Sequence, residues 1–170
     1  MNLEEIRRKA LEYDKYSGCS QSVLLALQEA FKIGNLETFK AATVLSGGVA
    51  RKGETCGALL GGLMALGLVL GRDDIVDTQT YRDAMEPSEE IIKAFQERLQ
   101  ETFAFDEPLE TTICRDIQEK IYGEWFDLTD PVSYQAFLDA GGHGEEGCPL
   151  VCSVAAQVTA EKLHKLGSIM

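Results

Sequence analysis

Residues 55–71 read TCGALLGGLMALGLVLG and form the only long uncharged stretch of the chain. At seventeen residues, this stretch is at the short limit of what a helix needs to cross a bilayer. Small residues recur at every fourth position, at Gly53, Gly57, Gly61 and Ala65, and such a stripe lets another helix pack closely. Each glycine inside a helix costs about 1 kcal/mol relative to alanine, so close packing or a site must compensate. We therefore predict a buried, glycine-rich central helix rather than a membrane span.

On both sides of this stretch, apolar residues recur at spacings of three and four, as in Leu3, Ile6 and Ala10. This periodicity is typical of amphipathic helices, and strand-like alternation is hard to find. The sequence therefore predicts an all-α, single-domain bundle of about seven to nine helices that takes in residues 1–170. Their predicted positions are residues 2–15, 18–32, 35–49, 56–70, 74–104 with a break at Pro87, 112–121, 131–140 and 149–166.

The net charge of −12 would repel a nucleic acid backbone or an anionic membrane surface, so we expect neither as a partner. The acidity is concentrated between Asp73 and Glu146, which contain 20 acidic and 5 basic residues. We interpret this half as a solvated helical face, and docking to a basic protein is the alternative. Residues 1–10 have no apolar segment like that of a secretory signal, so we expect a cytoplasmic protein.

Four of the five cysteines lie where a helix is predicted to begin. Cys19 precedes an apolar repeat, Cys56 opens the uncharged helix, and Cys114 starts another periodic segment. Cys148 is followed by Pro149, and because proline is favoured at the first helical position, Cys148 is predicted to be the N-cap. An odd number of cysteines without a signal peptide indicates reduced thiols rather than a disulfide framework.

A helix N-terminus carries partial positive charge, which lowers the pKa of a thiol and stabilises a thiolate. Four cysteines in this context suggest that several helix starts converge on one thiolate-rich site, although small apolar cysteines at helix starts are an equal alternative. The spacings of 37, 58 and 34 residues exclude a sequential metal loop such as a CxxC knuckle. One cysteine from each of four helices would suit zinc or an iron–sulfur cluster.

The remaining candidates have plainer explanations. Cys152 lies one helical turn after Cys148, and we predict that it packs in the core. His143 is interpreted as a solvated loop histidine, with a nitrogen ligand or a proton donor as the alternative. His164 complements the negative end of the last helix, and two basic residues before Cys56, Arg51 and Lys52, are typical of a turn. The aromatic residues that we expect to pack are Tyr122, Trp125, Phe126 and Tyr134.

The segments YSGCSQSV, GETCGALLGGLMALG, ICRDI and CPLVCSVAAQVTAEKL together resemble the C_GCAxxG_C_C family of redox-active proteins. The likeness runs from Asp14 to Leu166. Cys152 is not one of the four family cysteines, and the chain has no CxxCH segment for covalent haem. The residues that match the family pattern are Cys19, Cys56, Gly57, Ala58, Gly61, Cys114 and Cys148.

This resemblance implies a bacterial or archaeal protein with redox activity, related to a domain fused to multihaem cytochromes that holds an iron–sulfur centre. The leading hypothesis is therefore a cluster for electron transfer, with an unidentified redox partner protein and a possible homodimer. Two alternatives stay open: a metal-free thiol–disulfide oxidoreductase, and a helical interaction module with a structural zinc or no metal. We expect Gly57, Ala58 and Gly61 to contact the cofactor. The predicted metal ligands, redox-active thiols if no metal is bound, are Cys19, Cys56, Cys114 and Cys148.

Overall fold

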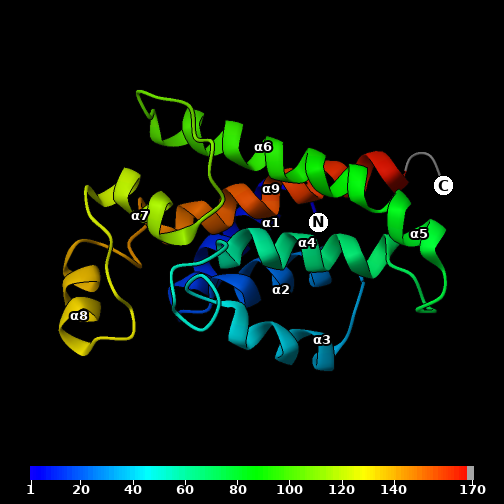
Figure 1. Ribbon diagram of the computed structural model, residues 1–170, viewed down its shortest axis with the longest axis horizontal. Coiled ribbons are helices and arrows are strands. Elements are labelled where there is room, and N and C mark those ends of the chain that lie inside the picture. The colour runs from blue at the N-terminus through cyan, green and yellow to red at the C-terminus, as the bar shows by residue number, and fades with distance from the viewer. Residues whose placement is uncertain (168–170) are drawn as a thin grey trace.

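The computed structural model describes residues 1–167, and these form an all-α bundle (Figure 1). They contain nine α-helices and one 3-10 helix, which confirms the predicted fold class. The helices are α1 (Leu3–Asp14), α2 (Cys19–Phe31), α3 (Leu36–Ala41), η1 (Ala42–Leu45), α4 (Gly57–Leu70), α5 (Thr78–Asp83), α6 (Met85–Phe103), α7 (Cys114–Tyr122), α8 (Pro131–Asp139) and α9 (Cys148–Gly167).

The centre of the bundle is shared by α9 and the glycine-rich helix α4. Helix α9 packs against α1, α2, α4 and α6, and every residue from Pro149 to Ala160 except Leu150 is buried. Helix α4 packs against α2, α9 and α6, as predicted for a helix that is apolar on all sides. Within the described residues, no helix has both the length and the apolar character to span a membrane.

The glycines of α4 allow two neighbouring helices to approach its backbone. A Cβ atom on Gly61 would lie 2.3 Å from the carbonyl oxygen of Ser20 on α2. A Cβ atom on Gly62 would lie 2.4 Å from Oγ1 of Thr159 on α9. The predicted close packing along the glycine stripe is therefore present from Gly57 to Ala65, whereas Gly53 lies before the helix.

Two predicted helices are wrong in their extent. The segment 35–49 is helical only to Ala41, followed by η1, because residues 47–51 adopt left-handed backbone conformations. The segment 74–104 breaks at Ala84 and not at Pro87. Pro87 lies in the first turn of α6, where an N–H group has no partner within the helix, so the missing donor costs nothing.

Three of the long helices begin at the same end of the bundle. Figure 1 shows α2, α4 and α9 starting beside α7 and α8, whereas α5 lies at the opposite end. The helix starts that carry the cysteines are therefore neighbours in space. We call this part of the molecule the cavity end.

Candidate functional site

The four predicted cysteines line one cavity at the cavity end. Cys19, Cys56, Cys114 and Cys148 contribute to its wall, and its volume is about 60 Å³. A cavity of this volume is larger than one water molecule needs. All four thiols are free, and each comes from a different helix start. Residues that are far apart in the sequence thus share one enclosed space.

The helix starts position each thiol as the sequence suggests, with one correction. Helices α2 and α7 begin at Cys19 and Cys114, and Cys56 is the N-cap of α4. Cys148 is the first residue of α9 rather than its N-cap. Its N–H group donates to the Tyr122 hydroxyl at 2.9 Å and to the Gly142 carbonyl at 3.1 Å, and these two acceptors replace the missing helical partner.

Backbone pairing between two distant segments brings Cys56 and Cys114 together. Thr55 and Ile113 form an isolated antiparallel bridge. The N–H group of Cys56 donates to the carbonyl of Thr112 at 2.8 Å, and that of Cys114 donates to the carbonyl of Glu54 at 2.6 Å. The segments that lead into α4 and α7 are therefore held side by side, and both thiols reach the cavity.

A strained loop closes one side of the cavity. Residues 47–51 all have positive φ angles, including Val49 at 59° and Arg51 at 63°. A β-branched residue rarely adopts this conformation, and such strain is concentrated at functional sites. The loop brings the Gly47 N–H to Cys19, where it lowers the thiol pKa against larger opposing effects. A Cβ atom on Gly48 would lie 2.7 Å from that of Cys114, so only glycine leaves room for this thiol.

Of the three residues expected to contact a cofactor, only Ala58 lines the cavity. Gly57 lies directly behind Cys19, since a Cβ atom there would be 2.6 Å from the Cys19 sulfur. Gly61 lies one turn further along α4, in contact with the backbone of α2. The structure therefore gives Gly57 and Gly61 a packing role that holds two cysteine-bearing helices close to each other.

Burial raises the pKa of all four thiols. For Cys19 and Cys148 burial is the largest cause, and the negative charge of Asp14 adds to it. The pKa of Cys148 rises to about 12. Burial and the charges of the other three cysteines raise the pKa of Cys114. At Cys56, the backbone N–H groups of Leu59 and Ala58 lower the pKa and partly offset the effect of burial. Without a cation the thiols stay protonated at neutral pH.

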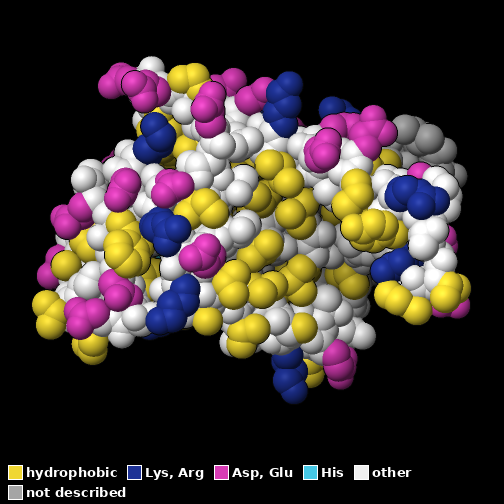
Figure 2. Space-filling view, viewed as in Figure 1, with side chains coloured by type: hydrophobic (Ala, Val, Ile, Leu, Met, Phe, Trp, Pro, Cys, Tyr) yellow, Lys and Arg dark blue, Asp and Glu magenta, His cyan; other side chains and the backbone are white. Residues whose placement is uncertain are grey.

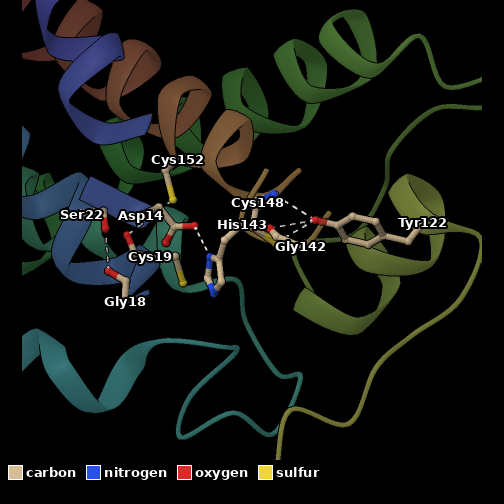
Figure 3. A network of polar contacts seen from close by, with 9 residues as sticks. All are labelled: Asp14, Gly18, Cys19, Ser22, Tyr122, Gly142, His143, Cys148 and Cys152. Atoms are coloured by element: carbon tan, nitrogen blue, oxygen red, sulfur yellow. Dashed lines mark hydrogen bonds and ion pairs between the residues drawn. The ribbon is translucent and has the colours of Figure 1, made fainter. Parts of the chain in front are cut away.

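Two further residues line the cavity: Asp14, which was not predicted from the sequence, and His143, which was assigned to a solvated loop. Asp14, the last residue of α1, is 1% exposed and lines the cavity. His143 also lines it, and its Nδ1 lies 3.2 Å from Oδ2 of Asp14 (Figure 3). The interpretation of His143 as a solvated loop residue is therefore wrong, because the loop folds back onto α1. Asp14 follows Ile6 and Ala10 on one helix face, where an apolar residue is expected. A charged residue at such a buried position was the signal in the sequence that could have identified it.

Two polar side chains donate hydrogen bonds to cysteine sulfurs. Buried Gln118 lies with its Nε2 3.6 Å from the sulfur of Cys114. The Tyr122 hydroxyl has two hydrogen-bond acceptors in reach, the sulfur of Cys148 at 3.5 Å and the carbonyl oxygen of Gly142 at 3.2 Å (Figure 3). Burial raises the pKa of Tyr122, so the hydroxyl keeps its proton. Such bonds to ligand sulfurs adjust the reduction potential of a metal centre.

Three of the four aromatic residues that we expected to pack do so, and they form a wall beside the cavity. Tyr122, Phe126 and Tyr134 pack around Phe137, whereas Trp125 is 38% exposed. Arg51 lies over the Tyr134 ring, 4.8 Å from its centre, and lines the cavity. Arg51 is thus part of the site rather than an ordinary turn residue.

Cys152 is packed in the core beside the cavity, as predicted. It is fully buried and does not line the cavity, and its thiol donates a long hydrogen bond of 3.8 Å to the carbonyl of Cys19. Figure 3 shows its side chain extending from α9 toward Asp14 and Cys19. Its pKa is raised by burial and by the charge of Asp14.

The donor set fits a thiolate-bound metal group better than it fits a single ion. Within residues 1–167, no three His, Cys, Asp or Glu side chains are arranged to hold one metal ion. The thiols line a cavity instead, and in an iron–sulfur cluster four cysteines are distributed over two or four irons, so their sulfurs stand further apart than around one zinc. The unpartnered Oδ1 of Asp14 and four thiols with raised pKa all favour a cationic occupant.

Comparison with protein-family models gives one match, to the model described as "Putative redox-active protein (C_GCAxxG_C_C)", over residues 17–162. Neither the curated proteins nor the solved structures contain a match to this chain. The matched region covers all four cysteines that line the cavity and most of the helices.

Proposed function

Because this chain belongs to the C_GCAxxG_C_C family of redox-active proteins, we propose that it transfers electrons through an iron–sulfur cluster held by four cysteines. The observation that carries this proposal is the convergence of four free thiols on one cavity. The ligands would be Cys19, Cys56, Cys114 and Cys148. When bound, the cluster supplies one-electron chemistry that no protein side chain here provides.

The protein's own residues then hold the thiols, exclude water and adjust the potential. Cys56 and Cys114 are buried, so solvent reaches the cavity poorly from their side. Gln118 and Tyr122 donate hydrogen bonds to sulfur, which stabilises the more reduced, more negative state of a centre. Each helix start adds partial positive charge toward the thiolates.

The raised pKa values count against metal-free thiol exchange. The attacking species in that reaction is the thiolate, and a reactive cysteine has a lowered pKa and an exposed sulfur. All four cavity cysteines show the opposite shift, with burial as its largest cause. A metal group reverses this balance because its positive charge deprotonates the thiols on binding.

The proposal is tested by purifying the protein without oxygen and measuring its colour, iron and acid-labile sulfide. We expect coloured protein with iron and sulfide in similar amounts. Cys56→Ser is expected to lower both iron and sulfide several-fold, because it removes one of the four proposed cluster ligands. The matched control is Cys152→Ala, which removes a buried thiol that does not line the cavity. This variant should retain the iron and sulfide content of the native protein.

Colourless protein that stays free of iron after reconstitution with ferrous iron and sulfide would refute the proposal. Two further outcomes would then identify the alternative. One zinc ion per chain, whose removal unfolds the protein, would indicate a structural module. One cysteine that reacts rapidly with an alkylating agent at pH 6 would indicate thiol–disulfide exchange.

A further inference from the structure

The ring of His143 is held so that one nitrogen is occupied and the other is available to the cysteine cavity. Nδ1 lies 3.2 Å from Oδ2 of Asp14, and the ring lines the cavity with its side chain 19% exposed. Figure 3 shows the second ring nitrogen on the side away from Asp14, toward Cys19. The Phe137 ring packs against the imidazole in a T-shaped arrangement, with the two ring centres 5.4 Å apart and an angle of 87° between the ring planes. The imidazole is therefore oriented by contacts on two sides.

The loop that carries His143 is fixed to the rest of the protein at several points. The Tyr122 hydroxyl reaches the Gly142 carbonyl, and the Gly142 N–H donates to the carbonyl of Phe137 at 2.9 Å. An ion pair of 2.9 Å joins Glu145 to Lys15, the residue after Asp14. These contacts hold the loop against the end of α1. The Asp14–His143 pair is thus built into the fold.

Asp14 makes the metal-free cavity less stable. Its carboxylate is 1% exposed, and Oδ1 has no hydrogen-bond partner within the described residues. A buried acceptor without a partner costs free energy, and a buried negative charge next to thiols costs more. The same charge opposes ionisation of Cys19, Cys56 and Cys148. Packing alone gives no reason for a carboxylate here.

Metal-binding histidines usually donate their second ring N–H to a carboxylate, which fixes the tautomer and makes the free nitrogen a better ligand. Asp14 and His143 have this arrangement, and the free nitrogen has access to the cavity of the proposed cluster. We propose that Nε2 of His143 is a nitrogen ligand of the metal centre in the cysteine cavity, with Asp14 as its positioning residue. This inference rests on the proposed function.

The inference makes the donor set mixed, with one nitrogen and four sulfurs. A single tetrahedral ion takes four donors, so five donors require a centre with more than one metal position.

The chain contains two histidines, which makes a direct test possible. Protein labelled with ¹⁵N only in histidine is reconstituted with ferrous iron and sulfide, reduced, and measured by pulsed electron paramagnetic resonance. We expect the nitrogen coupling of a directly bound imidazole in the native protein and in His164→Gln. The coupling should be lost in His143→Gln. His164 is a suitable control because it lies near the end of α9, against Phe31 and away from the cavity.

A second measurement needs no cluster and uses Co²⁺ alone as the probe, at several equivalents per chain, so that separate ions can occupy the separate metal positions of the centre. The reduced, metal-free protein is titrated with Co²⁺, and its thiolate-to-metal absorption is followed. His143→Gln and Asp14→Asn are each expected to weaken binding by about 10- to 100-fold, whereas Cys152→Ala should leave it unchanged. Circular dichroism and thermal unfolding show whether each variant keeps the native fold.

The possible outcomes separate this inference from the proposed function. A cluster without ¹⁵N coupling, together with native Co²⁺ affinity in folded His143→Gln and Asp14→Asn, would overturn the histidine ligand and leave the cluster in place. Native protein that takes up neither the cluster nor Co²⁺ would overturn both. Loss of coupling only in His143→Gln, with weaker Co²⁺ binding in both variants, would support both.

Discussion

The two ends of helix α4 contain the same residue types but lie in different environments. At its start, Gly61 touches the backbone of α2, and Gly57 leaves space for the thiol of Cys19. Near its end, Gly67 has no atom within 4 Å of its Cβ position, and Leu68 is 39% exposed. Glycine at the cavity end therefore permits a close helix contact, whereas Gly67 lowers helix stability without a compensating contact.

The difference extends from this helix to the whole molecule. Around the end of α4 the side chains of Leu63, Leu66 and Leu70 lie beside the start of α6, and Figure 2 shows apolar side chains gathered over α4 and the neighbouring parts of α5 and α6. The cavity end holds buried thiols, Asp14 and a left-handed loop. One end is thus packed with apolar side chains, whereas the other holds polar and strained groups at a cost in stability.

The largest expected effect is a loss of stability of the metal-free protein at high pH. The folded state raises the pKa of the cavity thiols above 9.0, to about 12 for Cys148. The unfolded chain releases these protons first, so the stabilisation is complete below pH 9 and declines above it. The free energy of unfolding should fall by about 1.4 kcal/mol per pH unit for each thiol that stays protonated, as measured by urea unfolding between pH 8 and pH 10.

The double variant Cys19→Ala/Cys148→Ala is the control for this effect, because it removes two of the four cavity thiols. Its stability should depend less steeply on pH over the same range. An equal slope in the variant and the native protein would contradict the assignment to the cavity end.

The next effect compares two glycines of α4 directly. Gly61→Ala should destabilise the protein by about 1–3 kcal/mol, because the new Cβ lies 2.3 Å from the Ser20 carbonyl and α2 must move. Gly67→Ala should stabilise it by about 1 kcal/mol through higher helix propensity. Denaturant unfolding of both variants measures the difference. If both substitutions stabilised the protein, the close contact with α2 would be absent.

The smallest effect concerns strain in the loop at the cavity end. Val49 has a φ angle of 59° and is 38% exposed, so glycine can replace it with little loss of packing. Val49→Gly should raise stability by up to about 1 kcal/mol, because glycine adopts the left-handed conformation without strain. Ala94→Gly in α6 should lower stability by about 1 kcal/mol in the same unfolding experiment. Equal losses in both would show that Val49 is not strained.

The sequence alone determined the helical class, most helix positions and the four cysteines at helix starts. These features depend on local periodicity and on residues close together in the chain, such as Cys148 with Pro149. The early end of the helix after Leu36 was not predictable in this way, because the segment that contains the left-handed loop is paired, through Gly53 and Glu54, with the distant start of α7.

Only the tertiary structure decided which side chains share the cavity. Asp14 and His143 are 129 residues apart, yet they pair there, and the bridge between Thr55 and Ile113 brings Cys56 next to Cys114. No local pattern encodes these contacts, because they form only when α1, α4, α7 and α9 pack together and close long loops. Residue type and spacing thus indicate which groups can do redox chemistry, and packing determines which of them can do it together.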